Sequence, residues 1–179
     1  MLSGGDTMSI YLKKFNLDDL EKEFEFFTTH EGEHGYTNPY YCSSREEFMN
    51  NSVKQILDFE KGINLRPGYV PGTYFLLWED DHIVGCFNVR HYLNYSLEQG
   101  AGHIGYYILP QYRRRGFAKL GLSLALKELI KLDDFDRERG EVYLSCAKDN
   151  TGSLKTMLAN NGYIHHEDDK EYYVRIKIK

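Results

Sequence analysis

The sequence is poor in cysteine, in proline and in long apolar runs. Its 179 residues include three cysteines and four prolines. Cys42, Cys86 and Cys146 are an odd number and have no metal-ligand spacing, so we expect neither a disulfide framework nor a zinc knuckle, and a reducing compartment fits best. No apolar run approaches the ~20 residues of a membrane-spanning helix. We therefore expect a cytoplasmic protein that makes no use of a membrane.

The first residues lack the basic and apolar regions of a signal peptide. Their Ser, Gly and Asp content is typical of a flexible leader, and Met8 is an alternative start. We expect residues 1–8 to form such a leader and residues 9–179 to form one domain with a single hydrophobic core.

Net charge argues against a partner that is a polyanion. The formal charge is −5 and the sequence pI is about 5.8, whereas nucleic-acid binders rely on an excess of Lys and Arg. Positive charge is nevertheless concentrated at one place, where Arg113, Arg114 and Arg115 are followed by Lys119. A local basic cluster on an acidic chain indicates one small anionic ligand.

Hydrophobic periodicity predicts an α/β domain with no internal repeat. Helices are expected to start at Asn16 and at Ser43 or Ser44, where side chains can cap them, and to cover residues 116–132 and 151–160. The helix that starts at Ser43 or Ser44 should bury Met49, Val53, Ile56 and Leu57. Strands are expected at 9–15, 73–79, 82–93, 103–109 and 141–147, with a closing pair within 163–179. The order indicates a mixed, mostly antiparallel sheet flanked by about four helices.

Residues 103–118 carry the most specific chemistry. They read as a strand, a basic turn and the first turn of a helix that opens on Gly116 and Ala118. Such a helix start presents unpaired N–H groups and the positive end of the helix dipole, and small residues let a phosphate approach. The segment contains neither a Walker loop nor a dinucleotide fingerprint. Taken alone, the arginines are better interpreted as a solvated helix start, because charge runs usually just face solvent.

Two motifs together resemble the GNAT superfamily of acetyltransferases. Arg113-x-x-Gly116-x-Ala118 is similar to its [Q/R]-x-x-G-x-[G/A] acetyl-CoA motif, and Lys148-Asp149-Asn150-x-x-Ser153 is similar to its second block. More narrowly, the segments 88–94 and 102–106 resemble a bacterial subgroup of predicted acetyltransferases. The resemblance implies a single-domain GNAT fold with acetyl-CoA as co-substrate and no metal.

The same resemblance assigns the cofactor residues. The backbone of Ile108 and Leu109 should pair with the pantetheine arm as an added strand. Asn150 should contact the pantetheine or the thioester region, with Ser153 in the same motif. A simple N-cap of the following helix is the other reading of Asn150, and both roles can coexist. The pyrophosphate should be held by the segment with the basic turn, namely Arg113, Arg114, Arg115, Gly116, Phe117, Ala118 and Lys119.

The catalytic groups are less clearly marked. Many family members carry a tyrosine seven residues after the Asn, as the acid that protonates the leaving thiolate, but Met157 stands there and reads better as a core residue. A primary amine of pKa ~10.4 must also lose a proton before attack. His103 lies where relatives often carry a glutamate and is the first candidate for that base, beside a structural reading. Glu98, His91 and Glu79 are the alternatives.

The leading hypothesis is acetyl transfer from acetyl-CoA to a primary amine by direct attack in a ternary complex. A non-catalytic CoA-binding or regulatory domain and a transferase for longer acyl chains remain alternatives. The acceptor is expected to be a small molecule or a peptide amine, and a homodimer is left open. Four loop tyrosines border the acceptor cleft in this reading, although aromatic residues often serve packing alone: Tyr36, Tyr40, Tyr41 and Tyr69.

Overall fold

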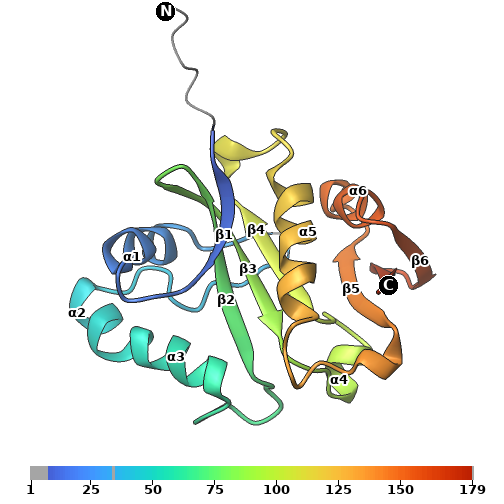
Figure 1. Cartoon of the computed structure of the whole chain (residues 1–179), viewed down its shortest axis with the longest axis horizontal. Helices are drawn as coiled ribbons and strands as arrows, with labels where there is room; N and C mark the ends of the chain where they lie inside the picture. The colour runs from blue at the N-terminus through green and yellow to red at the C-terminus, as the bar shows by residue number, and fades with distance from the viewer. Residues whose placement is uncertain (1–7, 34, 179) are drawn as a thin grey trace, which may run out of the picture.

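A computed structural model describes residues 8–33 and 35–178 of the chain. Apart from Met8, the expected leader lies outside these residues. The described chain forms one α/β domain, which confirms the predicted fold class, with α1 to α3 on one side of a central sheet and α5, α6 and a second sheet on the other (Figure 1).

The strands form two sheets rather than one. The first has the order β1-β2-β3-β4 and the second β5-β7-β6, and every pairing of named strands is antiparallel. The bounds match the predicted strands closely, because alternating apolar residues and acidic turns mark them. They are β1 Ile10–Lys14, β2 Gly72–Glu79, β3 His82–Arg90, β4 Ile104–Ile108, β5 Glu141–Ala147, β6 Gly162–Glu167 and β7 Glu171–Lys177.

The helices differ from the predictions at two places. The first helix starts at Leu20 rather than after Asn16, whose Oδ1 instead accepts from the N–H groups of Asp18 and Asp19 in the preceding turn. A short helix follows β3, where the sequence pattern predicts a polar loop. The α-helices are α1 Leu20–Thr29, α2 Arg45–Glu47, α3 Val53–Lys61, α4 Tyr95–Glu98, α5 Phe117–Leu129 and α6 Thr151–Leu158, and 3-10 turns cover Pro110–Tyr112 and Arg137–Arg139.

A π-helical segment, Phe48–Ser52, joins α2 to α3 and changes which side chains are buried. Ser44 caps this helical run as predicted, since its Oγ accepts from the N–H of Glu47. The wider π turn adds a residue to the repeat. Phe48 and Ser52 are therefore buried with Ile56, whereas the predicted Met49, Val53 and Leu57 are only partly buried.

Two apolar clusters cover the opposite faces of the first sheet. One contains Phe87, Ile104 and Ile108 with Leu122 and Leu129 of α5, and it continues into the second sheet. The other contains Leu76 and Tyr107 with Phe27 of α1, and Phe48 and Ile56 of the second helical run. Because alternate residues of β4 point to opposite faces, this strand belongs to both clusters.

The two sheets are hydrogen-bonded to each other at one end only. Gly102 forms an isolated bridge with Leu144 of β5, and the N–H of His103 donates to the carbonyl of Tyr143 at 2.7 Å. No further β4–β5 pairing occurs among the described residues. From this junction β4 and β5 separate toward their C-terminal ends.

His103 is part of the junction and not of an open cleft. Its side chain is 1 % exposed, lies against the rings of Phe135 and Tyr143, and accepts through Nδ1 from the N–H of Tyr143 at 2.9 Å. Burial, with the nearby charge of Arg139 as the next cause, lowers the pKa of His103 to about 3. These contacts support the structural reading of His103 and argue against the predicted role as a general base.

Replacement of Gly102 by Ala should open this junction. The backbone has φ +66° there, and an added Cβ would lie 2.1 Å from the carbonyl oxygen of Tyr143. We expect a loss of about 3 kcal/mol or more in the free energy of unfolding, measured with urea. Gly140→Ala is the matched control, because Gly140 has φ +70° with nothing within 4 Å, and it should cost only about 1 kcal/mol. Equal losses in the free energy of unfolding of the two variants would show that the close contact with Tyr143 does not require glycine at position 102.

His103 should also make stability depend on pH. The folded-state pKa of about 3 lies below the ordinary value of 6.5, so between these values only the unfolded chain binds the proton. The contribution of His103 to the free energy of unfolding is complete above pH 6.5. It is lost as the pH falls toward 3, by about 1.4 kcal/mol per pH unit. Urea unfolding of wild type and His103→Gln between pH 7 and 4.5 should show a smaller decline in the variant. Parallel declines would mean that His103 does not titrate in this way.

Candidate active site

The gap between β4 and β5 presents unpaired backbone edges. The N–H of Leu109 bonds to the carbonyl of Val84, and the N–H of Arg90 bonds to the carbonyl of His103. Because antiparallel pairs alternate in direction, the N–H and C=O groups of Tyr106 and Ile108 point away from β3 and into the gap. On the facing strand the same alternation turns Ser145 toward them. An extended molecule could therefore pair with either edge.

This alternation separates the two residues predicted to bind pantetheine. Ile108 faces the gap, although its carbonyl already accepts from Nε of Arg113 at 2.9 Å. Leu109 uses both backbone groups within the protein, since its N–H donates to Val84 and its carbonyl accepts from Tyr112. Tyr106, which the sequence analysis did not select, is therefore better placed than Leu109 to pair with a ligand.

Tyr106 of β4 and Asn150, which follows β5, lie on the two sides of the gap. The hydroxyl of Tyr106 lies 2.7 Å from Oγ of Ser153, so the side chain connects β4 with α6. Asn150 is the N-cap of α6, because its Oδ1 accepts from the N–H of Ser153 at 3.1 Å. The capping alternative for Asn150 is thereby confirmed, while its contact with a cofactor stays a prediction.

The basic turn before α5 forms a run of unpaired donors. In the described part of the chain, the N–H groups from Arg114 to Lys119 have no hydrogen-bond acceptor, and Leu120 is the first to bond back, to Gly116. Arg114 and Gly116 both have positive φ, 61° and 85°, which turns successive N–H groups toward one side. An added Cβ at Gly116 would meet nothing within 4 Å. The turn therefore has the unpaired donors and the open space that an anion site needs.

The side chains around this turn have different tasks. Arg113 forms an ion pair with Glu33, and Arg115 one with Glu79, so both cations hold the loop to its surroundings. Arg114 and Lys119 are exposed and have no carboxylate partner within the described chain. Phe117 is buried in the core and Ala118 is partly buried. Only the backbone of these last two residues faces a ligand.

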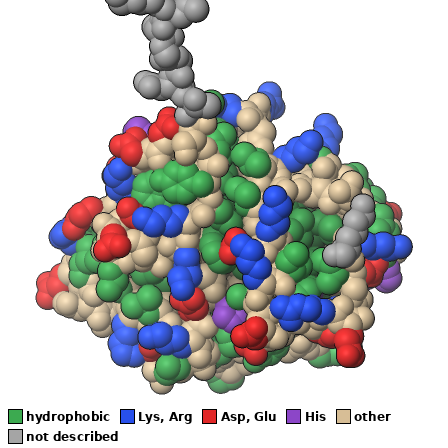
Figure 2. Space-filling model, in the orientation of Figure 1, with side chains coloured by type: hydrophobic (Ala, Val, Ile, Leu, Met, Phe, Trp, Pro, Cys, Tyr) green, Lys and Arg blue, Asp and Glu red, His purple; other side chains and the backbone are tan. Residues whose placement is uncertain are grey.

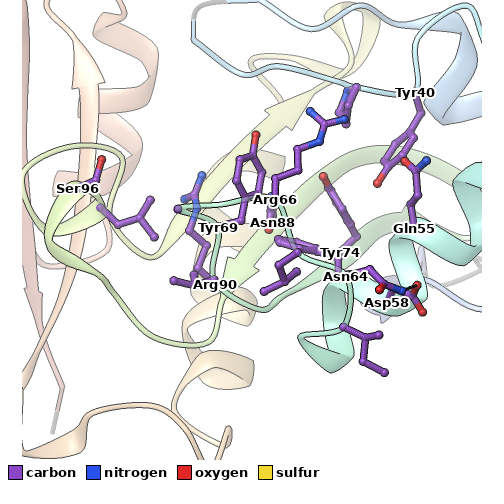
Figure 3. A pocket seen from close by; sticks show the side chains of 17 residues that line it. Tyr40, Gln55, Asp58, Asn64, Arg66, Tyr69, Tyr74, Asn88, Arg90 and Ser96 are labelled. Carbon is purple, nitrogen blue, oxygen red and sulfur yellow. Dashed lines mark hydrogen bonds between the residues drawn. The ribbon is translucent and has the colours of Figure 1, made fainter.

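A cavity of about 540 Å³ lies between α3 and β3, on the face of the first sheet that is opposite to α5. Its side chains come from α3, β2, β3, α4, the loop between α1 and α2 and the loop before β2 (Figure 3). Of the four tyrosines predicted at an acceptor pocket, Tyr40 and Tyr69 line this α3–β3 cavity, whereas Tyr36 stacks on Tyr107 and Tyr41 is exposed. The polar lining includes Tyr40, Gln55, Asp58, Asn64, Arg66, Tyr69, Tyr74, Asn88, Arg90 and Ser96.

The inner end of the α3–β3 cavity reaches the junction of the sheets. Arg90 donates through Nη1 to the carbonyl of Gly102 at 3.0 Å, and its Nη2 would lie 3.9 Å from a Cβ added to Gly105. Gly105 pairs with Asn88 across β3 and β4, and nothing else lies within 4 Å of that Cβ position. The cavity is therefore open beside β4, where the gap also begins.

The remaining predicted catalytic residues are held by other contacts. Glu98 forms an ion pair with Arg139 at 2.5 Å, Nε2 of His91 lies 2.8 Å from Oγ1 of Thr73, and Glu79 pairs with Arg115. None of these contacts supports a role as proton acceptor. Met157 is 1 % exposed in the core cluster, which confirms its reading as a packing residue.

Charges of both signs are mixed on the face of the molecule that Figure 2 shows, where Lys and Arg side chains alternate with Asp and Glu. Within residues 8–33 and 35–178 no three His, Cys, Asp or Glu side chains gather as metal ligands. No helix of the described chain has the length and apolar character to cross a membrane.

Comparison with solved structures shows the same fold in several acetyltransferases. The ribosomal L7/L12 α-N-protein acetyltransferase RimL, solved with coenzyme A, has a TM-score of 0.67 at 13 % identity, over 94 % of this chain and 94 % of that one. The ribosomal-protein-S5-alanine acetyltransferase from Vibrio fischeri gives 0.66 at 14 %, over 96 % and 97 %. The microcin C7 self-immunity acetyltransferase MccE, solved with acetyl-CoA and AMP, gives 0.62 at 11 %, over 94 % and 92 %.

A search of curated proteins finds no sequence match. The family model described as "Acetyltransferase (GNAT) domain", however, matches residues 9–162, which is most of the chain. This match covers β1 to the start of β6, and so includes the gap, the basic turn and the α3–β3 cavity. The chain therefore belongs to the GNAT acetyltransferase family.

Proposed function

We propose that the protein is a cytoplasmic N-acetyltransferase that transfers the acetyl group of acetyl-CoA to a primary amine. The observation that carries the proposal is the run of unpaired N–H groups from Arg114 to Lys119, which lies at the open end of the gap between β4 and β5. An anion site at one end and free strand edges along the gap fit a molecule with a pyrophosphate and an amide-containing arm.

In this proposal the predicted cofactor residues have different roles toward acetyl-CoA. The pyrophosphate is bound by the N–H groups of the turn, with Arg114 and Lys119 as the available cations. Arg113 and Arg115 position the turn through Glu33 and Glu79. The pantetheine amides pair with Tyr106 and Ile108, whose backbone groups face the gap, while Asn150 and Ser153 border the arm from α6. Leu109 acts through its side chain alone, which is buried.

The amine acceptor occupies the α3–β3 cavity, which meets the gap beside Gly105. The neutral amine attacks the thioester carbonyl carbon, so that a C–N bond forms while the C–S bond breaks. The electron pair leaves with the sulfur, the nitrogen loses one proton, and the thiolate takes one up. A cavity of this volume has the size of a small-molecule site. This adjoining cavity favours an enzyme over a domain that only binds CoA.

The absence of an acid at position 157 is compatible with turnover. A thiol has a pKa near ~8.5, so its thiolate is a tolerable leaving group at neutral pH without a proton donor. Met157 is instead required by the core, where it is fully buried and packed between α6 and the second sheet. Deprotonation of the amine, with a pKa ~10.4, is the larger demand.

A Gly116→Glu substitution should abolish the anion site. The new carboxylate would enter the open space over the turn and repel a pyrophosphate there. We expect the Kd for CoA, measured by calorimetry, to rise by roughly tenfold or more. Gly140→Glu is the matched control, with φ +70° and equally open space at a different turn, and it should leave the Kd unchanged. If folded Gly116→Glu binds CoA with an unaltered Kd, the pyrophosphate does not bind at this turn.

Turnover should be detectable as thiol release from acetyl-CoA in the presence of amines. We expect at least one member of a panel of amino acids, polyamines, aminoglycosides and peptides to be acetylated at a rate well above that of acetyl-CoA hydrolysis. Gly116→Glu should lose this rate through a raised KM for acetyl-CoA. Tight binding of acetyl-CoA with no acetylated amine in the panel would favour the binding-domain alternative.

A further inference from the structure

The α3–β3 cavity is positively charged although the chain is acidic. Two cations, Arg66 and Arg90, line it, against the single carboxylate of Asp58. That carboxylate accepts from Lys54 and from Nδ2 of Asn64, and the hydrogen bond from Lys54 lowers its pKa. The acid is thus neutralised within the protein, while the net charge of the whole chain is −5. The cavity therefore favours an anionic group and disfavours polycations.

Arg90 is the cation at the inner end. It lies on β3, is partly buried, and donates one hydrogen bond to the protein, to the carbonyl of Gly102. No carboxylate of the described residues pairs with it, and burial lowers its pKa from the ordinary value. A desolvated guanidinium with spare donors is costly unless an anion satisfies it. Its planar fork matches a carboxylate in a bidentate arrangement.

Asn88 provides a second unsatisfied group on the same strand face. Its Oδ1 is buried and accepts no hydrogen bond from the described residues. Because side chains two residues apart on a strand share a face, Asn88 and Arg90 both line the cavity, as Figure 3 shows. Asn88 pairs with Gly105 of β4, but its Oδ1 would lie 3.2 Å from a Cβ added to Gly72, so the oxygen points toward β2.

We infer that the acceptor is a small amine that also carries a carboxylate, such as a free amino acid, with the carboxylate on Arg90. The inference rests on the proposed function, whose site it refines. Arg66 and Tyr69 at the exposed rim add a second cation and a hydroxyl to the same cavity. A polyamine would find no available carboxylate in this cavity and would face two guanidinium groups.

The test compares amines that differ only in the anionic group. The standard amino acids as free acids, their α-amides and the corresponding decarboxylated amines are assayed with acetyl-CoA by thiol release. We expect the preferred free acid to exceed its own amide in kcat/KM by about 10- to 100-fold, the value of a hydrogen-bonded charge pair. Phosphoethanolamine tests a phosphate in place of the carboxylate. If it or an uncharged amine is preferred, the assignment of a carboxylate is overturned while acetyl transfer stands.

Variants locate the preference at Arg90. Arg90→Gln should raise the KM for the free acid by about 10- to 100-fold, leave the KM for acetyl-CoA unchanged, and make the acid and the amide equivalent. Arg90→Lys keeps the charge and should retain part of the preference. Arg45→Gln is the matched control, because Arg45 pairs with Glu21 on the exposed surface outside the cavity. An Arg90→Gln enzyme that loses acid and amide turnover equally would show a merely structural residue and contradict the inference.

Direct binding separates the two proposals. Calorimetry with wild type saturated with CoA measures the free acids and the amides without any turnover. Binding of a free acid that Arg90→Gln weakens supports the inference even when no acetylation occurs, in which case the proposed function fails alone. If neither acids nor amides bind and acetylation of other amines proceeds, the inference fails alone.

Discussion

The site depends on the contact that holds the two sheets together at one end. His103 exchanges hydrogen bonds with Tyr143 where Gly102 bridges to Leu144, and beyond that point β4 and β5 have no mutual hydrogen bonds in the described chain. A closed pairing would satisfy the backbone edges and leave no room for a ligand. The junction therefore keeps the strands close enough to share one core and far enough apart to leave their edges available. Buried His103, neutral at ordinary pH, is part of this contact.

Strand bounds and antiparallel pairing could be predicted from the sequence, whereas the register between strands could not. β2 and β5 were expected within a residue of where they lie, because apolar alternation and Asp-rich turns are local signals. Whether Leu109 or Ile108 faces the gap depends on register with β3, which no local pattern encodes. The orientation of His103 likewise follows from the bend at Gly102, whose φ is +66°. The α3–β3 cavity was predicted only through Tyr40 and Tyr69, since Asn88 and Arg90 were noted as part of a segment that resembles a subgroup of acetyltransferases but were given no role.

The arginines show how one charge type performs two tasks in this fold. Arg113 and Arg115 form ion pairs with carboxylates, and these ion pairs hold in place the turn that presents the backbone donors. A turn held in this way binds an anion mainly through N–H groups, which lose no side-chain entropy on binding. Arg90 differs, because the protein leaves its fork without a counter-ion at the floor of a cavity. The sequence cluster at 113–115 is thus more conspicuous than Arg90, although Arg90 has more donors left for a ligand.

The position of Met157 illustrates how packing constrains the chemistry. Its side chain fills a site between α6, α5 and the second sheet, and Gly162 approaches its backbone so closely that an added Cβ would lie 2.7 Å from the Met157 carbonyl oxygen. A phenol there would have to displace core side chains, a cost of about 1–3 kcal/mol for overpacking. The thiolate needs little help to depart, so a core residue is retained at small catalytic cost. In the proposed reaction the demanding step is then the delivery of an unprotonated amine, so we expect the polar groups of the α3–β3 cavity, rather than α6, to determine selectivity and rate.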